Sequence, residues 1–415
     1  MSFDVSRVRA DYPALQDGTA YLDGAAGTQV PTPVIDAITD AYRGGLGNVG
    51  GAFASSTRSE AIVEAARSAV ADLVGGVAGG VVFGPSTTSL IYRMAAVLSR
   101  RWAPGDSIVV SRLDHDSNIR PWVQAADRVG AAVHWADVDP ATGELPVAQY
   151  EHLVDSRTRL VAVTAASNIL GTRPDVPSIA EIAHAVGALV YVDGVHVTPH
   201  IPVSFAELGA DLFATSAYKW SGPHLGAVVA SPDLLEPLRP DKLAPSPDDV
   251  PERFERGTLP FADLAGVTAA VDHLAGLAGG GSASVAAGPW AVATDEDAVG
   301  SRRERILASM AAVQAHETEL FGRLLDGLAA MNHVTLYGKA GRRTPTVYFN
   351  VVGQAPRSVA EALAARGINV WNGSNYALEL VKTLSLPNGA VRAGLVHYND
   401  ASEVDRLVSA VAGLA

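Results

Sequence analysis

The chain of 415 residues is longer than one hydrophobic core usually supports, so we expect two domains. Its formal net charge of −13 makes nucleic acid and anionic membrane surfaces poor partners. Cysteine is absent, which excludes disulfides, thiolate metal sites and a cysteine nucleophile. The N-terminus has no signal-peptide core and no apolar stretch of about 18 residues suggests a membrane span, so we expect a soluble, cytoplasmic protein.

The first residues predict a short amphipathic helix, a turn and the apolar segment Ala20–Leu22. The small-residue loop Asp23–Gly27 follows, which either lets backbone approach a ligand closely or is an ordinary tight turn. Helices are expected over Pro33–Tyr42 and Ser59–Val74. Gly44–Ser56, between them, is rich in glycine and small residues, which is typical of a mobile loop.

A strand that turns into hydroxyl residues is the first candidate binding element. The segment Gly80–Ile91 predicts a strand, a Gly-Pro turn and a helix that begins with Ser86, Thr87 and Thr88. Free backbone N–H groups and the helix dipole favour an anion at such a point, and the threonine hydroxyls add donors. Simple N-capping of the helix is the alternative interpretation.

Strands and helices then alternate over Ser107–Ser111, Ile119–Val129, Ala131–Trp135 and Leu160–Thr164. This alternation predicts an α/β fold with a mostly parallel sheet covered by helices. His115 and Asn168 each follow a strand, so both should reach the carboxyl edge of the sheet. His115 could stack as a neutral imidazole on a planar cofactor, or it could cap the turn that follows it.

The segment Gly187–His196 is a continuous apolar run that closes with Asp193, a glycine and, three residues after the acid, His196. Such a run fits a strand that is buried on both faces of a parallel sheet. A buried carboxylate needs a cationic partner or several donors. The protonated ring nitrogen of pyridoxal phosphate is one such partner, beside a lysine that forms an imine with the cofactor.

A strand within Asp211–Pro223 ends in Ser216 and delivers Lys219 between two aromatic residues. Desolvation there would lower the lysine pKa, as an imine-forming lysine needs. A surface lysine on a loop is the alternative. The order of an acid-ended strand and then a lysine-ended strand favours pyridoxal phosphate as the cofactor. Strand ends would thus bring one set of polar residues to one edge: Ser86–Ser89, His115, Asn168, Asp193, His196 and Ser216–Lys219.

The second half of the chain predicts a smaller α+β unit. Residues Ala275–Gly300 are rich in Gly, Ala and Ser and suggest a flexible insertion, part of which burial of Trp290 could order. Further elements are expected over Arg303–Met331, Val334–Tyr337, Thr346–Val351, Ser358–Arg366, Asn369–Trp371, Ala390–Val396 and Ser402–Leu414. Arg392 lies in an apolar strand, where a substrate carboxylate or an internal acid should pair with it. We find no internal repeat, metal-ligand spacing or P-loop.

These elements divide the chain into four parts. We expect an N-terminal segment, residues 1–30, that packs with the small domain, and a large cofactor-binding domain over 31–275. The flexible insertion would occupy 276–302, and the small C-terminal domain 303–415.

Eight motifs in order resemble the fold-type I pyridoxal phosphate enzymes, specifically the class V aminotransferase group that includes cysteine desulfurases. The segments are YLDGAAGTQVP, STTSLIYRMA, DHDSNIRPW, ASNILGT, VYVDGVH, TSAYKWSGP, RFERGT and VRAGLVHYN. The resemblance implies a large domain with a mostly parallel, seven-stranded-type sheet and a smaller α+β domain.

The resemblance also implies a role for each matched residue. His115 would stack on the cofactor ring, Asp193 would pair with the pyridine nitrogen, and His196 would replace a glutamine near the phenolic oxygen. Lys219 would form the Schiff base. The phosphate and the cofactor would be bound by Thr87, Thr88, Asn168, Ser216 and Tyr218, and the substrate by Ala26, Asn168, Tyr376 and Arg392, with Arg392 on its carboxylate. Thr258 would reach the phosphate of the neighbouring subunit in a homodimer.

The sequence departs from the family pattern at several positions, of which Tyr376, Gly50 and Gly51 concern the substrate end of the pocket. Within Trp371–Ala377, Tyr376 stands where cysteine desulfurases carry their nucleophilic cysteine, so a persulfide cannot form. Gly50 and Gly51 replace a His-Arg pair, Gly24 replaces an asparagine, and Tyr218 replaces a histidine, although a phenol can still donate.

We therefore expect an enzyme that acts on an α-amino acid through an external aldimine, with freed Lys219 removing the Cα proton. Cβ–S (or other Cβ–X) lyase chemistry without a persulfide is the first choice. Transamination, epimerisation and oxidative decarboxylation share the same logic and stay open, and Tyr376, His196 and the Gly44–Ser56 loop should decide among them. The alternative from another class is a catalytically inactive cofactor-binding partner, for example in sulfur transfer.

Overall fold

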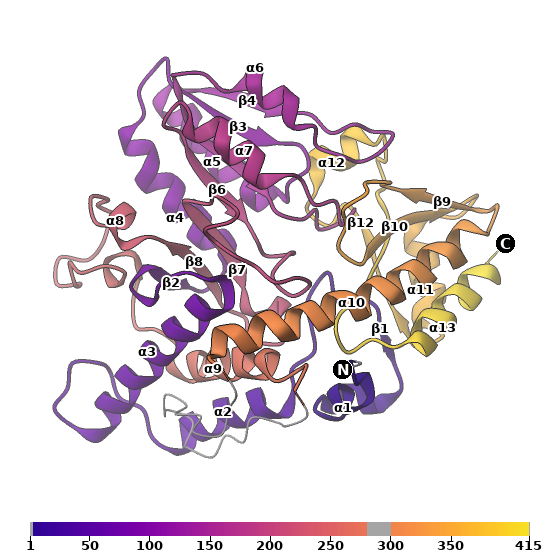
Figure 1. Ribbon diagram of the computed structural model, residues 1–415, viewed down its shortest axis with the longest axis horizontal. Helices are drawn as coiled ribbons and strands as arrows, with labels where there is room; N and C mark the ends of the chain where they lie inside the picture. Colours follow the sequence, from indigo (N-terminus) through magenta and orange to yellow (C-terminus); the bar gives the residue numbers. More distant parts are fainter. Residues whose placement is uncertain (1–2, 280–299, 415) are drawn as a thin grey trace.

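The computed structural model describes residues 3–279 and 300–414 (Figure 1). Its largest sheet has seven strands, in the order β2 (Val81–Gly84), β8 (Gly226–Ala230), β7 (Leu212–Ser216), β6 (Leu189–Asp193), β5 (Thr158–Thr164), β3 (Ser107–Ser111) and β4 (Ala132–Ala136). The strands from β7 to β4 run parallel, whereas β8 is antiparallel to both of its neighbours. The mostly parallel sheet is confirmed, and β8 is a strand that the sequence analysis missed.

Helices cover both faces of this sheet. Helices α3 (Ala54–Val74), α7 (Val176–His184) and α9 (Phe261–Ala275) pack on one face, and α4 (Thr87–Leu98) and α5 (Arg120–Val129) pack on the other. Along β6, Val190 and Val192 belong to the first core and Tyr191 to the second, and all three are 0% exposed. Burial on both faces explains why the strand sequences are continuously apolar.

Short or peripheral helices complete the large sheet's surroundings: α2 (Thr32–Arg43), α6 (Tyr150–Leu153) and α8 (Pro232–Leu235). Helix α3 begins at Ala54, so the expected loop Gly44–Ser56 ends at Phe53 and its last residues are helical. Residues 280–299, which include Trp290 and most of the expected insertion, lie outside the described part of the chain. Leu277, within the expected insertion, is 2% exposed. Among the helices described, none is both long enough and apolar enough to cross a membrane.

The C-terminal part forms a second, antiparallel sheet in the order β12 (Trp371–Gly373), β13 (Ala390–Gly394), β10 (Thr346–Val351) and β9 (Val334–Tyr337). Its helices are α11 (Pro356–Ala364), α12 (Leu378–Thr383) and α13 (Ala401–Ala412), and the long helix α10 (Arg302–Ala329) runs from α9 to this sheet (Figure 1). This is the expected smaller α+β unit. The expected single strand over Asn369–Trp371 is wrong, because its first half, β11 (Ile368–Asn369), pairs with β1 (Ala20–Tyr21) in a separate sheet.

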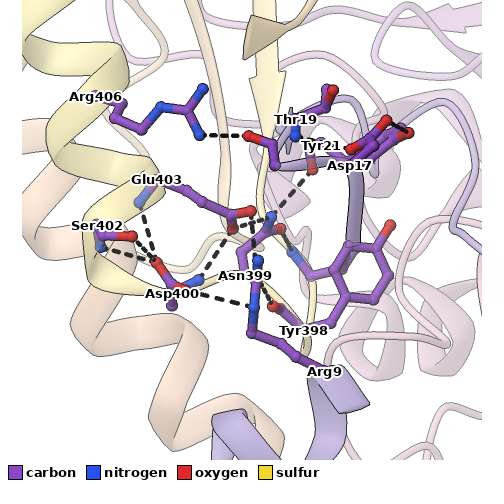
Figure 2. Close-up of polar contacts among 12 residues, drawn as sticks. Arg9, Asp17, Thr19, Tyr21, Tyr398, Asn399, Asp400, Ser402, Glu403 and Arg406 are labelled. Carbon is purple, nitrogen blue, oxygen red and sulfur yellow. Dashed lines mark hydrogen bonds and ion pairs between the residues drawn. The ribbon is translucent and has the colours of Figure 1, made fainter. Parts of the chain in front are cut away.

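Polar contacts join the N-terminal segment, with α1 (Val5–Ala10) and β1, to the start of α13 (Figure 2). Asn399 donates through Nδ2 to the backbone oxygen of Tyr21 at 3.1 Å and to Glu403 at 2.9 Å. Arg9 forms an ion pair with the same Glu403 at 3.1 Å, and Asp400 caps the helix. Backbone hydrogen bonds of Leu22 and Gly24 with Gly394 then hold this segment beside β13, the strand that carries Arg392.

Candidate active site

A cavity of about 1010 Å³ lies at the carboxyl edge of the large sheet, where it meets the small domain. The predicted site residues that line it are Ala26, Thr87, Thr88, His115, Asn168, Asp193, His196, Ser216, Tyr218, Lys219, Tyr376 and Arg392. Thr258 is exposed and does not line the cavity of its own chain. The expected convergence of strand ends is therefore present in the structure.

Lys219 ends the 3-10 turn Ala217–Lys219 that follows β7 and is 8% exposed, so it is not a surface lysine. Its Nζ donates to the backbone oxygen of Ala25 and lies 5.2 Å from the centroid of the Tyr218 ring. Burial, assisted by the charge of Arg392, lowers the pKa of Lys219 to about 7, although Asp193 opposes the shift. Near neutral pH the amine is therefore partly uncharged, as a nucleophile or base requires.

Asp193 ends β6 and is 5% exposed. Its Oδ1 accepts a hydrogen bond from the backbone N–H of Val195 at 3.0 Å. Burial raises the pKa of Asp193 to about 6, against the effects of that hydrogen bond and of the Lys219 charge. A cationic ligand facing this carboxylate would relieve the cost of burying it.

His115 lines the cavity and also caps the turn that follows β3. The backbone N–H of Ser117 donates to its Nδ1 at 3.1 Å, so the neutral ring carries its proton on Nε2. Burial, with the charges of Lys219 and Arg392, lowers the pKa of His115 to about 4. The stacking and capping interpretations are thus compatible, because a neutral imidazole held by its Nδ1 still presents a ring face.

The turn from β2 into α4 forms an anion cradle. Ser86 caps the helix by accepting from Ser89, which leaves the N–H groups of Thr87 and Thr88 without partners inside the helix. The hydroxyl of Thr87 donates to the backbone oxygen of Thr215 at 2.8 Å, which ties this turn to β7. A Cβ at Gly226 would lie 2.3 Å from the nitrogen of Thr87, so glycine is required there for β8 to pass.

Arg392 on β13 is 4% exposed, and its Nη1 donates to the backbone oxygen of Asn168 at 2.9 Å. Burial lowers its pKa to about 10. Asp23 is the internal acid whose charge acts on Arg392, but no carboxylate in the described part of the chain lies within ion-pair distance of the guanidinium. A substrate carboxylate would supply the missing anion.

Two residues with left-handed backbone conformations close the other side of the cavity. Asn375 has a φ of 49° and Tyr376 a φ of 60°. Their backbone oxygens accept hydrogen bonds from Asn168 Nδ2 and from the backbone N–H of Asp116, each at 2.8 Å. The Tyr376 side chain is 74% exposed, and its ring centroid lies 5.4 Å from that of His115.

The residues fit pyridoxal phosphate. The cavity offers a lysine of lowered pKa, a buried acid, a ring for stacking and an anion cradle. In addition, Asn168 Oδ1 and His196 Nδ1 are buried polar atoms in lining residues and have no partner among the residues described. A bound group with polar substituents would satisfy them, whereas an empty apolar cleft would not need them.

Sequence reasoning missed several residues that surround the site. Thr346 contacts His196, and the buried pair His200–Glu317 packs behind it. Glu317 carried a usable signal, because it falls on the apolar stripe of α10 between Val313 and Leu320 at helical spacing. An acid at such a position requires a polar partner from another element.

The family model for class-V aminotransferases matches residues 20–283 and 306–407. An uncharacterized protein of Mycobacterium tuberculosis, MT3887, is 38% identical to this chain, with both covered over their whole length. A probable cysteine desulfurase of Pseudomonas aeruginosa is 34% identical over 97% of this chain and 96% of its own. The apo structure of a cysteine desulfurase from Thermococcus onnurineus superimposes with a TM-score of 0.86 at 26% identity, covering 99% of this chain and 97% of the other.

Class-V aminotransferases and cysteine desulfurases depend on pyridoxal phosphate, and this sequence differs from the desulfurases in containing no cysteine. The match spans the seven-stranded and the four-stranded sheet and every predicted motif. The chain belongs to the class-V aminotransferase family of fold-type I enzymes, and its cofactor is pyridoxal phosphate.

Proposed function

We propose that this protein is a lyase that eliminates a sulfur or other leaving group from Cβ of an α-amino acid without a persulfide intermediate. The observation that carries the proposal is that a base, Lys219, lines one cavity with a cation, Arg392, that has no ion pair among the residues described. Tyr376 stands where a desulfurase has its cysteine, and the chain has no thiol that could accept sulfur.

Four groups would hold the cofactor. Lys219 Nζ would bond to its aldehyde carbon, the carboxylate of Asp193 would pair with its ring nitrogen, and His115 would stack on its ring. The cradle at Thr87 and Thr88 would take its phosphate. Pyridoxal phosphate, when bound, supplies an electron sink for the bonds at Cα of an amino acid.

The remaining steps belong to side chains of the protein. The guanidinium of Arg392 binds the substrate carboxylate and so orients the Cα–H bond. Lys219 Nζ, once free again and partly uncharged near neutral pH, accepts the Cα proton. The Cβ–X bond then breaks as a Cα–Cβ double bond forms, and X leaves with the bonding electron pair. No protein thiol receives it, so sulfur leaves as a free thiol or sulfide.

A screen of amino acids for spectral change and for products tests the proposal. Release of a 2-oxo acid, ammonium and the free leaving group in equal amounts supports it. Amino transfer to an added 2-oxo acid would make the protein an aminotransferase. Exchange of Cα hydrogen with racemisation, or release of carbon dioxide, would make it an epimerase or a decarboxylating enzyme. A protein that binds the cofactor and turns over none of these substrates would be an inactive partner.

The family resemblance also leads us to propose a homodimer. Thr258 is exposed and lies outside the cavity of its own chain, which suits a residue that reaches the phosphate of a neighbouring site. Thr258→Val should then weaken cofactor retention without altering any residue of the cavity. A monomeric mass in solution, or unchanged retention, would contradict this arrangement.

A further inference from the structure

His196 has one ring nitrogen in use and one free. It is 4% exposed and lines the cavity after β6. Its Nε2 lies 3.0 Å from the hydroxyl oxygen of Thr346, and its Nδ1 is buried without a partner among the described residues. What this histidine can offer a ligand therefore depends on which nitrogen carries the proton.

The hydroxyl of Thr346 determines which ring nitrogen of His196 carries the proton. Thr346 lies on β10 and is 0% exposed, so the proton of its hydroxyl needs an acceptor inside the protein. Among the described residues, Nε2 of His196 is the hydrogen-bond partner of this hydroxyl. An Nε2 that accepts a hydrogen bond bears no proton, so a neutral His196 carries its proton on Nδ1.

The surroundings keep the ring neutral and fix its plane. Burial, with the charges of His200, Lys219 and Arg392, lowers the pKa of His196 well below its ordinary value. The ring of His200 packs edge-on against it at 5.1 Å between centroids. His200 is itself held by Glu317 on α10, through Nδ1 and Oε2 at 2.8 Å. His200, Lys219 and Arg392 are therefore the titratable groups whose charges act on His196, and Glu317 acts only through His200.

We infer that Thr346 is a positioning residue that fixes His196 as a hydrogen-bond donor from Nδ1, directed at the phenolic oxygen of pyridoxal phosphate that the family resemblance places beside His196. The inference rests on the cofactor role of the cavity and deepens it. A donor at this oxygen withdraws electron density from it and makes the neighbouring nitrogen of the lysine-bound cofactor easier to deprotonate. The visible absorption band of the cofactor should report this directly.

The first experiment follows that band against pH in the cofactor-loaded protein. Thr346→Val removes the hydroxyl and should raise the titration midpoint by about 0.5–1 pH unit, the scale of one hydrogen bond. Thr346→Ser keeps the hydroxyl and should restore the original midpoint. Thr344→Val is the matched control, because Thr344 is equally buried but bonds to Gly171. An unmoved midpoint in Thr346→Val would overturn the assignment to the phenolic oxygen.

A double substitution isolates the pathway through His196. In a His196→Gln background the amide can donate without help from Thr346. Adding Thr346→Val to this background should therefore shift the midpoint no further. An equal shift in both backgrounds would mean that Thr346 acts through some other contact, and the inference would fail.

The tautomer is also measurable without the cofactor, by NMR of protein labelled with ¹⁵N in its 11 histidines. The resonance pair that disappears in His196→Gln should show a protonated Nδ1 and an unprotonated Nε2. The opposite pattern overturns the inference, even if Thr346→Val does not fold. A failure of the protein to take up pyridoxal phosphate would instead contradict the proposed function and would leave this measurement intact.

Discussion

The cavity has two ends that the protein holds in different ways. At the sheet end, Lys219, Asp193 and Arg392 are buried charges or potential charges without an ion pair among the described residues. At the loop end, hydrogen bonds to the backbone oxygens of Asn375 and Tyr376, together with ion pairs of Glu379, hold the residues around Tyr376. Uncompensated burial costs free energy unless a ligand supplies the partner. The sheet end is therefore completed by a ligand, whereas the protein itself completes the loop end.

The largest effect should come from removing the buried amine. Lys219→Ala should abolish the covalent cofactor band and lower turnover at least about 10⁴-fold, because both the attachment point and the base are lost. Absorbance and product assays measure the two losses. Lys339→Ala, at an exposed lysine outside the cavity, is the control and should change neither. A Lys219→Ala protein that keeps the covalent band would show that another lysine holds the cofactor.

The pH dependence of cofactor uptake tests the burial of Lys219. Only the uncharged amine attacks an aldehyde, and the pKa of Lys219 is about 7 instead of its ordinary 10.5. Uptake by cofactor-free protein should therefore accelerate up to about pH 7 and level off above it. Arg392→Gln should move this midpoint upward, because the charge of Arg392 contributes to the low pKa. A rate that keeps rising tenfold per pH unit to about pH 9 would indicate an ordinary lysine.

The sheet end is also the part that the sequence could predict. Asp193 and Lys219 follow apolar strands, and parallel strands deliver the residues after them to one edge. Composition and periodicity alone were therefore enough to bring them together. Strand β8 was not predicted from the sequence, because it is a five-residue strand after a Pro-containing loop. Its antiparallel direction also breaks the alternation of strand and helix.

The loop end could not be predicted in the same way. The left-handed backbone of Asn375 and Tyr376 has no signature in side-chain type beyond the asparagine, which tolerates that conformation. Their hydrogen bonds come from Asn168, 207 residues away, and from the backbone of Asp116. The contact between His196 and Thr346 likewise joins two elements 150 residues apart. Pairing at such separations follows from the tertiary fold and leaves no local pattern.

Arg392→Gln should produce the next largest effect on catalysis. Loss of a buried ion pair with the substrate carboxylate should raise KM by about 30-fold to a few thousand-fold, since such pairs are worth about 2–5 kcal/mol. The matched comparison uses the amine that lacks the carboxylate. The wild type should discriminate strongly between the acid and the amine, and the variant should not. Equal discrimination in both would remove Arg392 from substrate binding.

A smaller effect is expected at the ion pairs of the loop end. Glu379, at the start of α12, pairs with Arg120 and with Arg112, the latter at 3.3 Å. Glu379→Gln should loosen the segment from Asn375 to Ala377, giving faster amide hydrogen exchange there and a KM change of about tenfold or less. Glu361→Gln is the control, because Glu361 forms an exposed ion pair with Arg357 on α11. Unchanged exchange in Glu379→Gln would show that backbone hydrogen bonds alone hold the loop.

The smallest effect should come from the Tyr376 hydroxyl. Its side chain is 74% exposed and its hydroxyl has no hydrogen bond within the described residues, so Tyr376→Phe should change kcat less than about threefold. Tyr376→Ala should cost more, because it also removes the ring that lies against His115. Steady-state kinetics of the two variants show whether Tyr376 only lines the cavity or also donates a proton. A drop of about 100-fold in kcat for Tyr376→Phe would assign proton transfer to this hydroxyl. The loop end would then take part in the chemistry. This result would contradict the assignment of the reaction to the sheet end alone.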